Sequence, residues 1–274
     1  MSRRERAAIA RETEAIVAAG RYERHGRTVD IAASVAAARR GSHLHLPDDP
    51  ALDLAPSAAG AGSVEVTGET TLQAAARLAA DGHTAFAALN FASAHKPGGG
   101  YLNGAEAQEE ALARASALAE CLEAVPEFYE FHRRQQDPCY SDRVVCSPAV
   151  PVFRDDAGTL LAQPYEVTFL TAAAPNAGAL AGQGRPADLR SLIHRRARQV
   201  LAAAVLHDQR ALILGAWGCG VFRNDPVVVA DVFAGLLVDG YAGAFDRVTF
   251  AVLDRAPDAP TRGAFADRLG PLTA

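Results

Sequence analysis

Two adjacent glutamates, Glu109 and Glu110, follow three consecutive glycines in the stretch NFASAHKPGGGYLNGAEAQEE, residues 90–110. Carboxyl groups transfer protons in many hydrolases. Successive side chains of a helix do not face one another, so these two do not form the opposed carboxylate pair of a glycosidase. Each glutamate is therefore expected to have its own task. The alternative is that both only stabilise the positive end of the helix that begins here.

A second glycine-rich stretch, GAWGCGVFRND at residues 215–225, lies between an apolar segment and a helix expected to begin near Pro226. Glycine permits a tight turn whose N–H groups approach an anion without interference from side chains. The stretch has neither the Lys-Ser/Thr of a Walker A loop nor the GxGxxG spacing of a dinucleotide site. It predicts an anion-binding loop or, alternatively, a simple strand-to-helix turn.

These residues lie between segments that alternate between strand and helix patterns. Strands are expected at residues 63–68, 84–90, 143–155, 165–171, 211–217 and 247–254, and helices at residues 70–82, 106–124, 186–208 and 225–240. The alternation predicts an α/β fold with a largely parallel sheet between helical layers. Ligands of such folds bind at the carboxyl ends of strands. The loops TGETT, NFASAHKPGGG and GAWGCGVFRND each follow a strand, so we expect them to build one site.

The first 60 residues have a different pattern. Ser2 can cap a helix that ends at Gly20, and His25-Gly26 predicts the turn of a hairpin. A stretch rich in Pro, Asp and Gly, residues 45–63, predicts a connector. We therefore expect an N-terminal extension at residues 1–60 that packs on a main domain at residues 61–274.

Composition and charge exclude several classes of protein. The 274 residues carry a formal net charge of −5, which argues against a broad surface for nucleic-acid phosphates. Arg195, Arg196 and Arg198 are expected on a solvated helix face. No segment has the apolar length of a membrane span, and the N-terminus lacks the apolar core of a signal peptide. We expect no membrane association and a cytoplasmic location.

The four cysteines are expected to be reduced thiols. Cys121, Cys139, Cys146 and Cys219 form no CxxC pair and have no histidine at zinc-finger spacing. The sequence therefore predicts neither a metal site nor a cofactor.

The stretch NFASAHKPGGGYLNGAEAQEE resembles the signature of poly(ADP-ribose) glycohydrolases, in which a GGG, a short spacer and a QEE follow one another. The resemblance is to the bacterial type, a compact form built on a macrodomain. GAWGCGVF resembles the diphosphate loop of that family, and VTGETT resembles the start of macrodomains. The resemblance covers roughly residues 60–255. It implies a three-layer α/β/α macrodomain with a mixed, largely parallel sheet, plus an N-terminal helical extension.

The resemblance also implies roles for individual residues. Glu110 is the implied catalytic residue, which protonates the departing ribose 2′-oxygen and then activates water. Glu109 is implied to orient the ribose hydroxyls, and Gln108 to support the loop. The implied substrate-binding residues are Glu69 and Thr70 at the adenine end, Asn90 and Phe222 at the distal ribose, Gly98, Gly99 and Gly100 along the ribose and diphosphate, and Gly218, Cys219, Gly220 and Val221 around the diphosphate.

The implied activity is hydrolysis of ribose–ribose O-glycosidic bonds in poly(ADP-ribose), which releases ADP-ribose and belongs to the response to DNA damage. The expected partners are poly(ADP-ribose) or ADP-ribosylated proteins, bound by a monomer without a cofactor. A non-catalytic ADP-ribose reader and a mono-ADP-ribosyl hydrolase are the alternatives. The two glutamates favour catalysis, because a reader needs no acid at the scissile oxygen. A nucleotide phosphatase would normally require a metal cluster.

Overall fold

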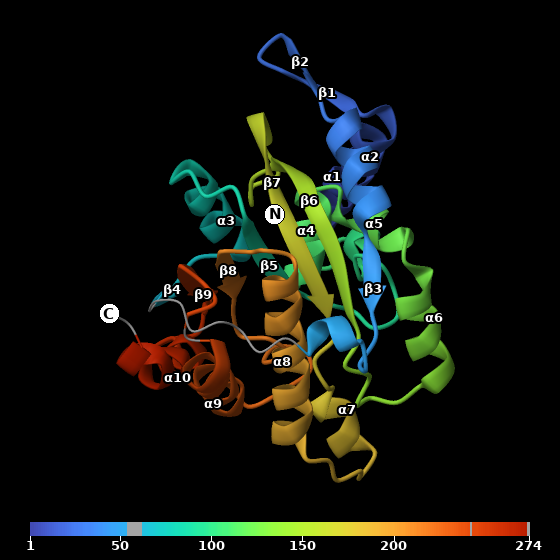
Figure 1. Ribbon diagram of the computed structural model, residues 1–274. Helices are drawn as coiled ribbons and strands as arrows, with labels where there is room; N and C mark the ends of the chain where they lie inside the picture. Colours follow the sequence, from blue (N-terminus) through green and yellow to red (C-terminus); the bar gives the residue numbers. More distant parts are fainter. Residues whose placement is uncertain (54–61, 242, 273–274) are drawn as a thin grey trace.

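The computed structural model describes residues 1–53, 62–241 and 243–272, and a seven-stranded sheet runs through its middle (Figure 1). The strand order is β3-β6-β7-β5-β8-β9-β4. Four neighbouring pairs, from β7 through β5, β8 and β9 to β4, are parallel, whereas β3/β6 and β6/β7 are antiparallel. The predicted mixed, largely parallel sheet is confirmed. Its strands are β3 (His43–His45), β4 (Ser63–Thr67), β5 (Phe86–Phe91), β6 (Val144–Arg154), β7 (Leu160–Ala172), β8 (Ala211–Leu214) and β9 (Arg247–Ala251).

Helices cover both faces of this sheet, because alternate side chains of each buried strand enter two separate cores. Along β5, Ala88 belongs to the first core, whereas Ala87 and Leu89 belong to the second. The first core is completed by α1 (Arg3–Ala19), α2 (Ala32–Gly41), α3 (Thr71–Ala80), α4 (Gln108–Ala115), α5 (Leu118–Glu123) and α6 (Pro126–Gln135). The second is completed by α8 (Leu189–Leu206), α9 (Pro226–Leu236) and α10 (Pro260–Leu269), while the short α7 (Ala177–Gly182) precedes α8. The three-layer α/β/α architecture is therefore as predicted.

The N-terminal segment folds locally as its sequence predicts. Ser2 forms a capping box with Glu5 at the start of α1, and Gly20 ends that helix in the left-handed conformation. His25 and Gly26 connect β1 (Arg21–Arg24) to β2 (Arg27–Asp30) in an antiparallel hairpin. The boundary expected near residue 60 lies outside the described residues. Strand β3, which precedes that boundary, pairs with β6 at the edge of the main sheet.

One predicted helix is interrupted. A single helix was expected over residues 106–124, but the structure has α4 and α5 with a break at Ser116. Ser116 forms an isolated β-bridge with Val152, and the Ala117 N–H donates to the Pro151 carbonyl over 3.1 Å. The break therefore results from pairing with β6, which local helix propensity does not reveal.

A second expectation, that Arg196 of α8 lies on a solvated face, is wrong. Arg196 was expected on a solvated face, yet it is buried with 0% of its surface exposed. Its guanidinium pairs with Asp142 over 3.1 Å and donates to the Ala173 and Cys139 carbonyls. A buried guanidinium persists only when its donors are satisfied in this way. Arg196 thus fixes the segment at residues 139–142. Helix α8 itself begins at Leu189, three residues later than expected.

Candidate active site

The three loops singled out in the sequence surround one cavity of about 920 Å³ at the carboxyl ends of parallel strands. Residues 69–73 follow β4, residues 91–95 follow β5, and residues 216–222 follow β8. The start of α4 and residues 251–255, at the end of β9 and just beyond it, also line the cavity. The three loops lie around one cavity, as expected. The contribution of residues 251–255 was not predicted from the sequence.

Glu110 lines this cavity and has one carboxylate oxygen without a protein partner among the described residues. It lies in the first turn of α4 and is half-buried. Its Oε1 accepts a hydrogen bond from the Gly100 N–H over 2.9 Å. Its Oε2 is buried and has no hydrogen-bond partner within the described residues. A carboxyl group with one oxygen fixed and the other available can exchange a proton with a bound ligand.

Glu109 has a different environment, although it is the adjacent residue. Only 2% of its surface is exposed. Its Oε2 accepts from the Ser93 N–H over 2.6 Å, and its Oε1 from Asn90 Nδ2 over 3.3 Å. Burial outweighs these bonds and raises the pKa of Glu109 to about 8. The two glutamates are thus not an equivalent pair, as the helical geometry predicts.

Gln108 and Asn90 lie behind the glutamates and connect α4 to β5. Gln108 accepts from the Phe91 N–H over 2.9 Å and donates to the Leu89 carbonyl over 2.8 Å. Asn90 is fully buried, donates to Thr171 Oγ1 over 3.1 Å and is not among the residues that line the cavity. The supporting role that the resemblance implies for Gln108 stays a prediction. The ribose contact implied for Asn90 stays a prediction.

The glycine run lies behind the glutamates and does not line the cavity. Gly98 and Gly99 have φ angles of 65° and 59°, which favour glycine. A Cβ on Gly99 would approach Glu110 Oε1 to under 3 Å and lie 3.1 Å from Glu109 Oε2. The structure therefore supplies a reason for glycine that the sequence did not reveal: Gly99 leaves room for both carboxylates. The ligand contacts implied for Gly98, Gly99 and Gly100 stay predictions.

The loop after β8 offers unused backbone donors to the cavity. The N–H groups of Gly218, Gly220 and Val221 make no hydrogen bond within the described residues, whereas the Cys219 N–H donates to the Ala216 carbonyl over 3.1 Å. A Cβ on Gly218 would collide with Ala174 and with Asn224. Val221 is 81% exposed. Three unpaired N–H groups in one turn fit an anion such as a diphosphate.

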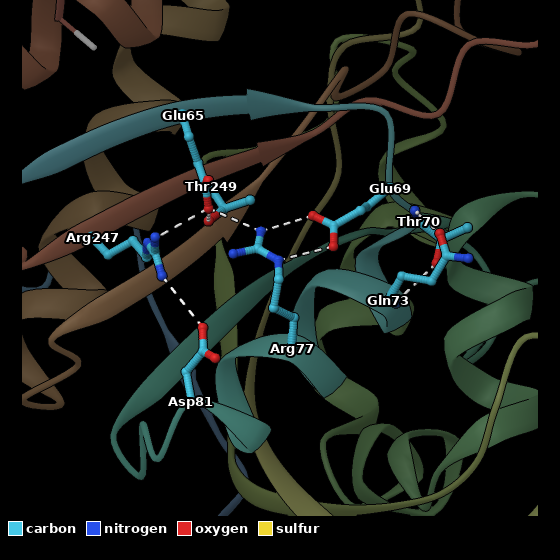
Figure 2. Close-up of polar contacts among 8 residues, drawn as sticks. All are labelled: Glu65, Glu69, Thr70, Gln73, Arg77, Asp81, Arg247 and Thr249. Atoms are coloured by element: carbon cyan, nitrogen blue, oxygen red, sulfur yellow. Dashed lines mark hydrogen bonds and ion pairs between the residues drawn. The ribbon is translucent and has the colours of Figure 1, made fainter. Parts of the chain in front are cut away.

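Glu69 and Thr70 also line the cavity, and both already have protein partners (Figure 2). Arg77 donates to both oxygens of Glu69 over 2.9 and 2.7 Å, and it also reaches Glu65. The hydrogen bonds from Arg77 lower the pKa of Glu69, so Glu69 is a carboxylate at neutral pH. Thr70 caps α3 in a capping box with Gln73. The adenine contacts implied for Glu69 and Thr70 stay predictions.

Three further residues of the site carry no local sequence signal. Arg6 of α1 lines the cavity and pairs with Glu106 over 2.8 Å. Tyr140 lies 5.8 Å from the Phe222 ring, and both rings line the cavity. Asp156 accepts a hydrogen bond from Thr70 over 2.6 Å. These three residues come from parts of the chain far from the motifs.

The protein is of the macrodomain type: it has a mixed sheet between helical layers, a cavity at the strand ends, a glycine turn with unpaired N–H groups and two glutamates at the start of a helix. Residues 10–155 match the family model described as the microbial-type PARG, catalytic domain. This range includes Glu109 and Glu110.

Solved structures extend the similarity over almost the whole chain. The chain is 53% identical to poly(ADP-ribose) glycohydrolase (PARG) from Thermomonospora curvata. The match covers 97% of this chain and 99% of that one, with a TM-score of 0.93. The structure of the same enzyme bound to the inhibitor ADP-HPD gives a TM-score of 0.91 at the same identity and coverage. PARG from Deinococcus radiodurans in complex with ADP-ribose is 48% identical over 87% of this chain and 98% of that one, with a TM-score of 0.81. No curated protein sequence gave a match. The chain belongs to the microbial-type PARG family.

Proposed function

We propose that this chain hydrolyses the ribose–ribose O-glycosidic bonds of poly(ADP-ribose) and releases ADP-ribose. Membership of the PARG family and the ADP-ribose complex of a relative support this substrate class. The observation that carries the catalytic assignment is the buried, unpartnered Oε2 of Glu110 beside the cavity. A protein that only binds ADP-ribose has no need of such an oxygen.

Glu110 acts first as an acid and then as a base. Protonated Glu110 gives its proton to the 2′-oxygen of the departing ribose while the bond from that oxygen to C1″ breaks. The resulting carboxylate removes a proton from the water that attacks C1″, so Glu110 ends the cycle protonated. The Gly100 N–H holds the other oxygen of Glu110 in place throughout. Diphosphate oxygens of the substrate stabilise the positive charge that develops at C1″.

Glu109 positions the sugar. Its raised pKa leaves it largely protonated at neutral pH, so it can donate a hydrogen bond to a ribose hydroxyl as well as accept one. A neutral Glu109 also avoids repulsion from the Glu110 carboxylate that forms during turnover. Gln108 keeps the start of α4 against β5 and thereby holds both glutamates at the cavity.

The remaining loops bind the rest of the ADP-ribose unit. The unpaired N–H groups of Gly218, Gly220 and Val221 contact the diphosphate, and Cys219 contributes to the turn rather than to the ligand. Phe222 lies against the distal ribose, and Tyr140 closes the same side. Glu69 and Thr70 line the adenine end.

Release of ADP-ribose from poly(ADP-ribosyl)ated protein tests the proposal, with Glu110→Gln and Glu127→Gln compared with the unchanged chain. Glu127 is an exposed glutamate of α6 and serves as the matched control. Glu110→Gln is expected to lower kcat by about 10²–10⁴-fold, the usual contribution of a general acid–base. Its affinity for ADP-ribose, measured by calorimetry, should stay within a few-fold, and Glu127→Gln should behave as the unchanged chain does.

Three results would contradict the proposal. Near-normal turnover by Glu110→Gln would show that another residue carries the proton. Binding of ADP-ribose without any release from the polymer by the unchanged chain would identify a reader instead of a hydrolase. Release only from singly modified proteins would identify a mono-ADP-ribosyl hydrolase.

A further inference from the structure

Three histidines converge at the edge of the sheet, and none of them lines the cavity described above. His43 and His45 lie on the same face of β3 because they are two residues apart in a strand. His207 follows the end of α8. The Nε2 atom of His45 is 3.1 Å from His43 Nε2 and 2.9 Å from His207 Nε2. All three rings therefore direct the same nitrogen at one point.

A cysteine completes the cluster. Cys146 of β6 is fully buried and stands directly opposite His43 in the antiparallel pair β3/β6. Ligand atoms of His43, Cys146 and His207 all lie within 4.8 Å of one another. A tetrahedral zinc site with Zn–N bonds of about 2.0–2.1 Å separates its ligand atoms by roughly 3.3 Å. The two distances between histidine nitrogens, 3.1 and 2.9 Å, are close to this value. The group of ligand atoms that includes Cys146 spans up to 4.8 Å and does not include His45, so the cysteine has to move closer when an ion binds.

The hydrogen bonds of the histidines fix where their protons are. His43 Nδ1 lies 2.7 Å from the Gly41 carbonyl, which can only accept, and His45 Nδ1 lies 2.8 Å from an Asp49 carboxylate oxygen. Both Nδ1 atoms must therefore carry the proton, and in the neutral rings both Nε2 atoms present lone pairs. Such outer contacts from a carbonyl or a carboxylate are the ones that orient metal-binding histidines.

This arrangement leaves one contact unexplained by hydrogen bonding. With all three rings neutral, His207 can donate an Nε2 proton to His45, but no proton then remains between His45 Nε2 and His43 Nε2. Two lone pairs facing each other at 3.1 Å repel each other, whereas a cation placed between them would bind both. A metal ion would accept a lone pair from each of the three rings at once.

We propose that His43, His45 and His207 bind a zinc-type divalent metal ion, with Cys146 as the fourth ligand. Imidazole and thiolate ligands in tetrahedral array favour Zn²⁺, and Co²⁺ can replace it. Binding would release the thiol proton of Cys146 to solvent. The ligands come from β3, β6 and the end of α8, so the metal joins the N-terminal segment to the main sheet. It acts as a structural clamp away from the glutamates.

Metal titration of the full-length protein tests the proposal after treatment with a chelator. The unchanged protein is expected to bind one equivalent of Zn²⁺ and to gain several degrees in its thermal midpoint. Co²⁺ should produce the intense visible bands of a tetrahedral site together with a near-ultraviolet thiolate charge-transfer band. Cys146→Ser should remove the charge-transfer band while the three histidines still bind Co²⁺, at least tenfold more weakly.

Single substitutions distinguish this site from casual binding to surface histidines. His43→Asn and His207→Asn are each expected to abolish the one-equivalent binding, whereas His194→Asn should leave it unchanged. His194 is an exposed histidine of the same helix α8 and is the matched control. His43 is partly accessible, so its variant should fold, and far-ultraviolet circular dichroism checks this. The absence of binding by the unchanged protein, or equal loss in His194→Asn and His207→Asn, would overturn the proposal. A charge-transfer band that survives in Cys146→Ser would overturn the assignment of Cys146.

Discussion

Substitution of Gly99 by alanine should impair catalysis far more than folding. The new methyl group would meet Glu110 Oε1 at under 3 Å, whereas ordinary van der Waals contact begins at 3.4 Å. The carboxylate must therefore retreat by on the order of 1 Å and give up its hydrogen bond from the Gly100 N–H. Because the displaced atom is the far end of a flexible side chain, the retreat itself costs little stability. The φ angle of 59° adds strain of about 1–2 kcal/mol for a non-glycine residue.

The expected loss of rate follows from that displacement. A misplacement of about 1 Å in a catalytic group lowers the rate by roughly 100-fold, which corresponds to about 2.7 kcal/mol in the activation free energy. Initial rates of ADP-ribose release at saturating polymer measure the effect on kcat, and urea denaturation measures the free energy of unfolding. Gly99→Ala is expected to lose about 100-fold in kcat with only about 1–2 kcal/mol of stability.

Gly184→Ala is the matched control for this substitution. Gly184 has a φ angle of 61°, but an added Cβ there would meet no atom within 4 Å. The two variants therefore share the backbone strain, and only Gly99→Ala displaces Glu110. Gly184→Ala should lose similar stability and keep full activity. The reasoning is refuted if folded Gly99→Ala retains kcat within about twofold, or if both variants lose the same activity.

Two more predictions concern the protonation of Glu109 and the hydrogen bonds of Asn224. The pKa of about 8 for folded Glu109 lies above its ordinary value of 4.5, so the folded state keeps a proton that the unfolded state releases between these pH values. Stability should therefore fall as pH rises through this window, by a few kcal/mol, and urea denaturation should show no such fall in Glu109→Gln. Asn224→Ala would leave the Pro175 carbonyl without its 2.8 Å donor and free the turn at Gly218, which should cost about 1–3 kcal/mol of stability. Calorimetry should show weaker ADP-ribose binding by this variant with a smaller effect on kcat; unchanged affinity would separate Asn224 from the binding loop.

Local signals in the sequence accounted for most of the elements. The capping residue Ser2 and the His25-Gly26 turn predicted the first helix and the hairpin correctly, because each acts within a few residues of the chain. The break at Ser116 was missed because its cause is Val152, which lies 36 positions away in sequence. The buried position of Arg196 was missed for the same reason, since Asp142 and two distant carbonyls satisfy its charge.

In the candidate site, too, local sequence patterns predicted some features, whereas others depend on contacts between distant segments. The GGG-to-QEE spacing and the GAWGCGVF loop were sufficient to select the three loops that surround the cavity, because the carboxyl ends of parallel strands meet at one edge. Spacing did not reveal that Gly99 faces the carboxylates rather than lining the cavity, or that burial distinguishes Glu109 from Glu110. Burial depends on atoms from many segments, and no local pattern records it.

Short-range chemistry was therefore determined by the sequence alone: the order of strands and helices, the glycine turns, and the two acids at the start of α4. The tertiary structure decided which groups are buried and desolvated, and which side chains distant in sequence are in contact. It made neighbours of His43 and His207, which lie 164 positions apart, and it placed Cys146 within 4.8 Å of both. The physical reason is that desolvation and ligand geometry are properties of a three-dimensional environment, whereas propensity and capping act along the chain.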